Sequence, residues 1–364
     1  MESIHNPGGN MDKNLLELYS DYLISSFSIT TATGLSNLLE GNISHDKITR
    51  FLSSQQYDSK DLWLLTKSIV RKIESLEGVL IFDDSIEEKP YTDENEIICY
   101  HYDHCQGRSI KGINFMTALY HSKGLSIPVS FQIIAKSEIG YDKSGKQIRK
   151  SPKSKNEYLR EMLKTCIQNN ISFRYVLNDV WFASSENMNY IHFDIARDFV
   201  MPLKTNRKVA LTLADKKQGR YQVISKVDIA PNTVREIYLE GVEFPLLLAK
   251  QIFTNGDDST GILYLVTSDK SLDYTQITTI YKKRWKVEEY HRSLKQNASL
   301  EKSPTKKEIT QSNHFFACLY SFIKLETLKS VSKMNHYALR TKIYVGALSQ
   351  AFKELQKLKL EFQN

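Results

Sequence analysis

Several features are scarce or missing in this chain of 364 residues, and each absence excludes a class of protein. No apolar run reaches the roughly 18 residues that a membrane-spanning helix needs, which excludes an integral helical membrane protein. The first nine residues lack a basic stretch followed by an apolar one, so we expect no signal peptide. The 4 cysteines have no framework spacing and fit a reducing compartment rather than a disulfide-rich secreted fold. We therefore expect a cytoplasmic protein.

The composition that remains is typical of a globular protein, with 41% hydrophobic and 25% charged residues and room for two or three domains. The net charge of +7 is unevenly distributed. Residues 136–160 carry eight Lys or Arg against three Asp or Glu, and residues 281–307 carry nine against three. Concentrated positive charge indicates a polyanion such as nucleic acid as partner. A solvated basic loop explains 136–160 equally well when that segment is taken alone.

The segment 1–75 follows a helical pattern and is slightly acidic. Residues 30–39 and 44–51 predict two short helices around a turn that contains Gly41, the outline of a helix-turn-helix. Small helical bundles share this outline, so DNA contact by the segment is a hypothesis.

Two apolar runs are followed directly by carboxylates. Val79–Phe82 is apolar at every position and predicts a central strand covered on both faces, after which Asp83 and Asp84 follow. Residues 173–177 predict a second strand that ends at Asp179. In open α/β sheets, ligands bind at the carboxyl ends of such strands. These acids are therefore candidates for a functional site.

The other predicted elements complete an α/β pattern. Residues 87–112 are expected to form turns and loops, residues 205–260 a β-rich insertion, and residues 262–266 a strand of the main sheet. Further elements are expected as follows: strands at 113–120 and 126–135, and helices at 156–167, 272–294, 315–328 and 337–358.

The predicted helix at 272–294 carries a polar stripe. At about 100° per residue, one narrow face holds a phenol, a guanidinium, a carboxylate and an ammonium. These belong to Tyr281, Arg284, Glu288 and Lys295. Such a set suits metal and phosphate chemistry. The alternative is a solvated helix face with an Arg284–Glu288 ion pair worth a few tenths of a kcal/mol.

Taken together, these residues resemble the DDE transposases of bacterial insertion sequences, and most of all the insertion-sequence-four-like group. The pattern Tyr-x2-Arg-x3-Glu-x6-Lys of that group is complete from Tyr281 to Lys295. Asp84 follows an apolar strand and precedes a hydroxyl residue, and Asp179 precedes an aromatic-containing turn, as in that group. The resemblance covers about residues 76–330.

The resemblance implies a ribonuclease-H-like catalytic core, formed by residues 76–204 and 261–330 and interrupted by the insertion at 205–260. A helical domain would precede it at 1–75, and a helical tail would follow at 331–364. It also implies that Asp84, Asp179 and Glu288 are catalytic and bind Mg²⁺, for which Mn²⁺ can substitute.

The implied activity is cleavage at the terminal inverted repeats of a mobile element and joining of its ends to target DNA. The protein would act as a homodimer on double-stranded DNA, in the bacterial cytosol near the nucleoid. Tyr281, Arg284 and Lys295 would contact the DNA backbone, with Trp285 and Arg292 beside them. Trp285 could stack on an unpaired base, as could Trp181, although packing in the core is the alternative for both.

Two local questions remain open in the sequence. Asp83 and Asp84 are adjacent, and alternation along a strand allows only one of them to reach the metals, so Asp84 is preferred for its hydroxyl neighbour. The cluster Cys99, His101, His104 and Cys105 resembles a zinc site, but four ligands within seven residues rarely close a tetrahedron. A hairpin or a DNA-facing loop is expected there.

Two other functions are compatible with the same residues. One is a DNA-binding repressor derived from a transposase that no longer cuts. The other is a cellular nuclease of the same fold.

Overall fold

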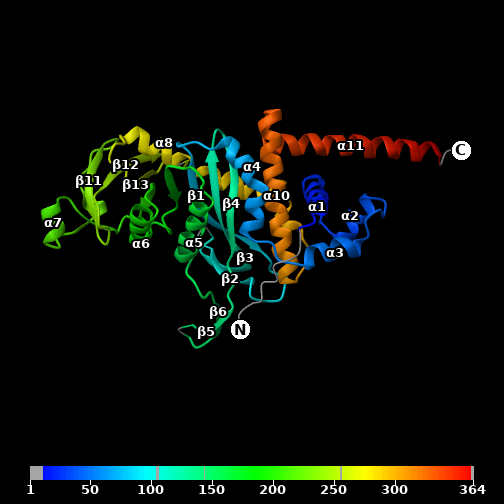
Figure 1. Ribbon diagram of the computed structural model, residues 1–364, viewed down its shortest axis with the longest axis horizontal. Coiled ribbons are helices and arrows are strands. Elements are labelled where there is room, and N and C mark those ends of the chain that lie inside the picture. Colours follow the sequence, from blue (N-terminus) through cyan, green and yellow to red (C-terminus); the bar gives the residue numbers. More distant parts are fainter. Residues whose placement is uncertain (1–10, 104–105, 143, 255, 362–364) are drawn as a thin grey trace. The chain divides into compact units, whose positions relative to one another are not determined.

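The computed structural model describes residues 11–103, 106–142, 144–254 and 256–361 (Figure 1). The chain forms two compact units. Unit 1 comprises Met1–Leu65, Ile86–Ile113 and Tyr290–Asn364, and unit 2 comprises Thr66–Ser85 and Asn114–Glu289. Four elements contain residues of both units: α4 (Ser59–Ile73), β1 (Val79–Glu88), β3 (Arg108–Ser122) and α9 (Trp285–Asn297).

Unit 1 is mainly helical. Its elements are α1 (Lys13–Ser25), α2 (Ala32–Leu38), α3 (His45–Ser53), β2 (Ile98–Asp103), η3 (Leu300–Lys302), α10 (Glu308–Ser332) and α11 (His336–Glu361). The side chains of Asp12, Thr31 and Ser44 cap the first three helices by accepting backbone N–H groups. The two short helices predicted at 30–39 and 44–51 are thus confirmed as α2 and α3.

The long helix α10 forms the core of unit 1 and packs against α1, α3 and α11. His314 on α10 is fully buried, and its Nδ1 lies 3.0 Å from the hydroxyl oxygen of Tyr19 on α1. The predicted helices at 315–328 and 337–358 are confirmed as parts of α10 and α11.

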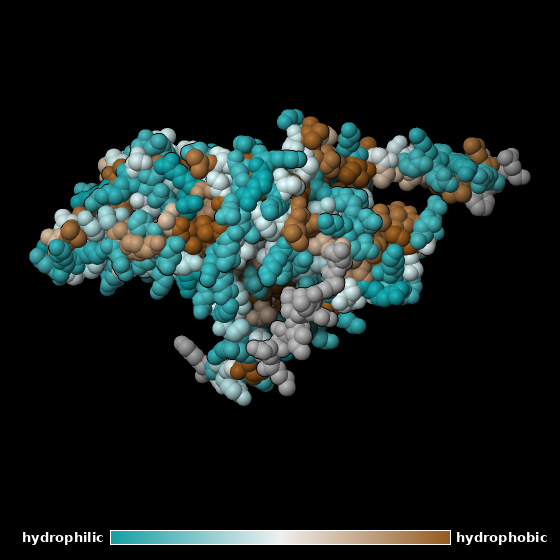
Figure 2. Space-filling model, viewed as in Figure 1, coloured by the Kyte–Doolittle hydropathy of each residue, from teal (hydrophilic) through white to brown (hydrophobic). Residues whose placement is uncertain are grey.

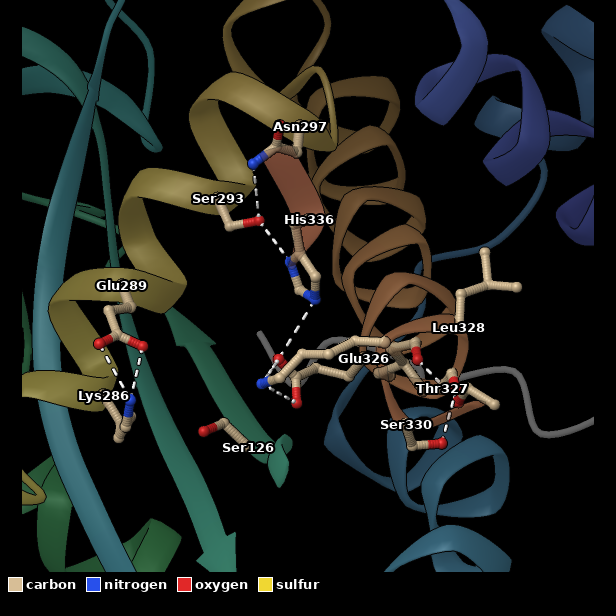
Figure 3. A network of polar contacts seen from close by, with 12 residues as sticks. Ser126, Lys286, Glu289, Ser293, Asn297, Glu326, Thr327, Leu328, Ser330 and His336 are labelled. Atoms are coloured by element: carbon tan, nitrogen blue, oxygen red, sulfur yellow. Dashed lines mark hydrogen bonds and ion pairs between the residues drawn. The ribbon is translucent and has the colours of Figure 1, made fainter. Parts of the chain in front are cut away.

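A buried polar network joins the second half of α9 to α10 and α11 (Figure 3). Ser293 Oγ lies 2.8 Å from His336 Nδ1, and His336 Nε2 lies 3.2 Å from Glu326 Oε1. Lys329 Nζ donates to the same carboxylate at 2.9 Å. A serine, a histidine and a glutamate in a row suggest a hydrolase, but these three are only 3%, 7% and 3% exposed. The network therefore holds helices together and offers no access to a substrate.

Unit 2 contains most of a large mixed sheet, in which the strand order runs β10-β9-β11-β12-β13-β8-β7-β1-β3 and β4 also pairs with β3. β7 pairs in parallel with both β1 and β8, while β3 pairs antiparallel with β4. Helix α5 packs on β4, and α8 packs on β8, β12 and β13. Strands β1 and β7 are central, as their unbroken apolar runs predict, because neighbours flank them on both sides.

The bounds of the elements of unit 2 follow. The strands are β4 (Leu125–Ile133), β5 (Glu138–Tyr141), β6 (Gln147–Lys150), β7 (Tyr175–Asn178), β8 (Asp198–Leu203), β9 (Lys208–Ala210), β10 (Gln222–Val223), β11 (Val234–Leu239), β12 (Leu246–Thr254) and β13 (Thr260–Thr267). The helices and helical turns are α5 (Lys155–Gln168), α6 (Ser185–Asn189), η1 (Tyr190–Asp194), α7 (Leu213–Lys217), η2 (Ile224–Lys226) and α8 (Tyr274–Lys282).

The predicted loop at 87–112 was wrong over much of its length. β1 continues to Glu88, and β2 pairs antiparallel with β3 from Ile98–Ile113 to Asp103–Arg108. The backbone explains the difference, because Lys89 N–H donates to the carbonyl of Lys111 at 2.8 Å and extends the ladder beyond the apolar residues. A ladder of backbone hydrogen bonds can carry polar side chains, so a polar sequence alone did not reveal it.

The region at 205–260 is rich in β-structure, as expected, and contains β9, β10, β11 and β12. β12 pairs along its whole length with β13, which in turn pairs with β8. The return of residues 262–266 to the main sheet is thus confirmed, whereas the division of the chain into domains stays a prediction. None of the helices in the described part of the chain combines the length and apolar character that a membrane crossing requires.

The single helix predicted at 272–294 was wrong. α8 ends at Lys282 and α9 begins at Trp285. At the junction and in the first turn of α9, the N–H groups of Arg284 and Val287 bond to the carbonyls three residues earlier, on Tyr281 and Arg284, at 2.9 and 3.0 Å. These are the bonds of a tightened helical turn, so the chain is overwound there rather than stopped.

Candidate active site

The candidate site in unit 2 begins with β1. Val79 to Phe82 are fully buried, and Phe82 lies opposite Asn178 in the parallel ladder with β7. The next residues are Asp83 on β1 and Asp179 directly after β7, so continuing the register places their carboxylates on the same face. A strand pair held rigid by its buried core thus presents two acids side by side.

Asp83 is the most buried of these acids, with 8% of its surface exposed. Burial raises the pKa of Asp83 well above its ordinary value, and the negative charges of Asp179, Asp84 and Glu288 raise it further. Carboxylate oxygens of Asp83 and Glu288 lie within 4.8 Å of one another. This is a concentration of negative charge that a cation would relieve.

Asp84 points to different partners. Its Oδ2 accepts a hydrogen bond from Asn114 Nδ2 at 2.8 Å and lies 2.6 Å from Lys155 Nζ. Asn114 is itself fully buried, and its Oδ1 has no hydrogen-bond partner among the described residues. Asp84 is therefore paired with a lysine of its own, whereas Asp83 lies among Asp84, Asp179 and Glu288.

Asp179 follows β7 in a turn that its own side chain stabilises. Its Oδ1 accepts the backbone N–H of Trp181 at 2.9 Å. Burial nevertheless raises the pKa of Asp179, because this hydrogen bond only partly offsets the loss of hydration and the nearby charge of Asp84. The prediction that a second strand delivers this carboxylate at its end is confirmed.

Arg284 lies in the overwound turn between α8 and α9 and connects two of the acids. Its Nη1 is 3.6 Å from Asp83 Oδ2 and 3.2 Å from Glu288 Oε1. The pKa of Arg284 is raised, since Tyr281, Asp83 and Glu288 together outweigh the opposing effect of burial. Burial also raises the pKa of Tyr281 to about 12, so this phenol stays protonated at neutral pH. The Arg284–Glu288 ion pair that a solvated helix face would contain is present, but it lies within a cluster of acids.

The remaining predicted residues are more dispersed. Trp285 and Trp181 are 55% and 47% exposed, so packing in the core was the wrong alternative for both. Arg292 is exposed on α9, within unit 1. Lys295 also belongs to unit 1, where its Nζ donates to the carbonyl of Ile86 at 3.0 Å and lies 3.6 Å from Glu301.

Two residues of the site escaped the sequence analysis. Asn114 was visible as a polar residue inside an apolar strand, which is a signal for a buried functional amide. Lys155 had no such signal, because one more lysine in a basic segment is unremarkable. In the cysteine–histidine cluster, Cys99 Sγ lies 3.3 Å from His101 Nε2 on β2, and His104 and Cys105 lie outside the described residues.

No curated protein matches the chain. Among solved structures, the chain is similar to one described as the Drosophila P element transposase strand transfer complex, with 13% sequence identity and a TM-score of 0.25. That match covers 48% of this chain and 34% of the other, a likeness too low to establish a shared fold or activity.

A family model described as DDE superfamily endonuclease matches residues 10–259. The match includes Asp83, Asp84 and Asp179 and ends before α8 and α9. Because it covers more than half of the chain, the protein belongs to the family of DDE superfamily endonucleases.

Proposed function

We propose that this protein is a DNA transposase, which cuts at the ends of an insertion sequence and joins those ends to target DNA. The observation that carries the proposal is the convergence of acids from β1, the end of β7 and α9 around Arg284, in a chain of the DDE endonuclease family. The strand order around β1, with β3 and β4 on one side and the parallel strands β7 and β8 on the other, supports a ribonuclease-H-like core.

The acids fit divalent cations of the Mg²⁺ type, which Mn²⁺ can replace. Carboxylate oxygens are the ligands that such hard cations prefer. The pKa of Asp83 is raised first by burial and then by the negative charges of Asp179, Asp84 and Glu288, which the charge of Arg284 only partly offsets. When bound, the cations would activate an attacking oxygen and stabilise the leaving oxygen in phosphoryl transfer. Asp179 and Glu288 are proposed as ligands, together with one acid of β1.

For the acid of β1 we favour Asp83 over Asp84, although the resemblance to transposases implied Asp84. Asp83 is near Glu288, whereas Asp84 is held by Lys155 and Asn114. Arg284 would then contact a DNA phosphate next to the acids, and Tyr281 would donate a hydrogen bond from its protonated phenol. Lys295, Arg292 and Trp285 remain proposed DNA contacts.

The insertion-sequence-four-like assignment rests on the pattern from Tyr281 to Lys295, which lies outside the residues matched by the family model. A homodimer on DNA is expected, because both ends of an element must be joined.

Terminal inverted repeats and a short target duplication around the coding region would support a mobile element, and a fixed genomic neighbourhood without them would support a cellular nuclease.

The decisive experiment uses Glu288→Gln, which keeps the shape of the side chain but removes its charge. We expect this variant to bind DNA carrying the ends of the element as the wild type does, and to lose Mg²⁺-dependent nicking by at least about a hundredfold. Undiminished nicking would remove Glu288 from the site. Specific binding by the wild type, with no cleavage in Mg²⁺ or Mn²⁺, would favour the repressor instead.

A further inference from the structure

A two-stranded ribbon formed by β5 and β6, residues 138–150, stands apart from the main sheet of unit 2 (Figure 1). The strands pair antiparallel from Glu138–Lys150 to Tyr141–Gln147. Asp142 fixes the turn, since its Oδ1 accepts the N–H groups of Ser144 and Lys146 at 2.8 and 3.0 Å. These bonds make the ribbon a defined structure rather than a loose basic loop.

One face of the ribbon combines apolar, aromatic and polar side chains. Ile139 lies opposite Arg149, and Tyr141 lies opposite Gln147. Ile139 and Tyr141 are 53% and 67% exposed and are two positions apart on one strand, so they share this face of the ribbon. Figure 2 shows a hydrophobic spot among hydrophilic side chains where Figure 1 places the ribbon.

The positive charge around this face favours a polyanion as its partner. Residues 136–155 carry seven Lys or Arg against two Asp or Glu, and Lys146 and Lys150 are exposed. On the other face, the stem of Lys150 covers Gly140, where an added Cβ would meet Lys150 Cε at 2.6 Å. A basic ribbon with an exposed aromatic residue and Arg and Gln side chains matches duplex DNA, whose major groove admits a two-stranded ribbon.

Both ends of the ribbon lead to the candidate site. On one side, Ile134 N–H donates to the carbonyl of Asn114 at 2.9 Å, and Asn114 holds Asp84. On the other side, Lys155 lies 2.6 Å from Asp84. At no more than about 3.6 Å per residue, the four or five residues between these anchors and the ribbon span at most about 18 Å. The base of the ribbon therefore lies near Asp84.

We propose that the ribbon enters the major groove of duplex DNA within about one helical turn, some 34 Å, of the phosphate at the candidate site. Its cations contact phosphates, and Gln147 and Arg149 face base edges, while Tyr141 and Ile139 make apolar contacts in the groove. This inference rests on the proposed function, because it assumes that DNA is the substrate of the neighbouring acids.

The test measures binding of the full chain to a fluorescein-labelled mixed-sequence duplex by fluorescence anisotropy, in EDTA and over a series of KCl concentrations. In a ribbonless variant, Asn-Gly replaces residues 139–149, which a two-residue turn permits because Glu138 and Lys150 are paired. We expect the Kd to rise at least about tenfold and the salt slope to fall by about 2 to 3, near 0.9 for each lost phosphate contact.

Point variants keep the test valid if the deletion disturbs folding. Lys146→Gln, which removes an exposed cation of the ribbon, should reduce the salt slope by about 1. Tyr141→Ala should weaken binding with little change in slope. The matched control is the double variant Lys164→Gln/Lys217→Gln, which removes two exposed cations of unit 2 from outside the ribbon. It should bind as the wild type does.

The outcomes separate the two proposals. A wild type that does not bind duplex DNA would overturn the proposed function and the ribbon inference together. Wild-type binding that every ribbon variant retains would overturn the ribbon inference alone. An equal loss in the control would overturn it as well, because general positive charge would then account for binding.

Discussion

At the scale of single residues, two adjacent carboxylates of β1 have opposite surroundings. Asp83 faces Asp179, Glu288 and Arg284, and Asp84 faces Lys155 and Asn114. Successive side chains of a strand point to opposite faces, which explains why Asp83 and Asp84 have different neighbours. The charges of these neighbours distinguish the roles that we propose for the two acids. Asp83, whose three acidic neighbours share the charge of Arg284, is the better metal ligand, and Asp84, which pairs with Lys155, positions that lysine.

This difference predicts how each acid affects metal binding. Asp83→Asn should weaken Mn²⁺ binding at least about tenfold, because it removes a ligand, while Asp84→Asn should change it by less than about threefold. Isothermal titration of the EDTA-treated variants with MnCl₂ measures both affinities without any catalysis. A larger loss of Mn²⁺ affinity in Asp84→Asn than in Asp83→Asn would show that Asp84 is the metal ligand.

The raised pKa of Asp83 also predicts a pH dependence of stability. In the unfolded chain an aspartate loses its proton near pH 3.9, whereas folded Asp83 keeps it to a higher pH. The free energy of unfolding should therefore fall as pH rises from about 4 through the raised pKa, by at most about 1.4 kcal/mol per pH unit.

Urea unfolding of the wild type and of Asp83→Asn in EDTA, from acid to mildly alkaline pH, isolates this contribution. The other acids are common to both proteins, so the difference between the two curves reports Asp83. Wild type should lose stability relative to the variant as pH rises. A difference that stays constant with pH would show that Asp83 titrates normally.

At the scale of elements, the junction between α4 and β1 sets the position of the acids. Gly78 precedes β1, and a Cβ there would meet the Tyr120 hydroxyl at 2.4 Å and its ring at 2.8 Å. The same hydroxyl accepts the N–H of Ser75 at 3.2 Å. Tyr120 on β3 therefore packs directly on the backbone that enters β1.

Gly78→Ala should destabilise the protein by about 1–3 kcal/mol, because a rigid aromatic ring must move to admit the methyl group. Urea unfolding measures the effect. Gly256→Ala is the matched control, since no described atom lies within 4 Å of the position that its methyl group would take, and it should be nearly neutral. An equal loss in both variants would point to glycine's backbone freedom rather than to Tyr120.

The elements that sequence could predict are those whose signal is local. The apolar runs before Asp83 and Asp179 located β1 and β7, and Ser44 marked the start of α3. The overwound turn at Arg284 contains no Gly or Pro, the residues that usually signal the end of a helix in a sequence. The Asn114 and Lys155 contacts to Asp84 span 30 and 71 positions, so only the folded chain brings them together.

At the scale of the whole molecule, the positive charge found in the sequence falls on two structures with different surroundings. The block at 136–160 becomes the ribbon and the start of α5, and the block at 281–307 becomes the end of α8, α9 and η3. In both blocks, some cations are exposed and others hold acids, as Lys155 and Arg284 do. Net charge alone therefore overstates the number of cations that are free to meet DNA.

The four elements that contain residues of both units limit how the gene can exchange one unit for another by recombination. Neither unit is encoded by one continuous stretch of the gene, and each junction falls inside α4, β1, β3 or α9. Domains that recombine as modules usually meet in exposed linkers. A crossover at any of these junctions would leave half a helix or half a strand, so the two units must be passed on together or lost together.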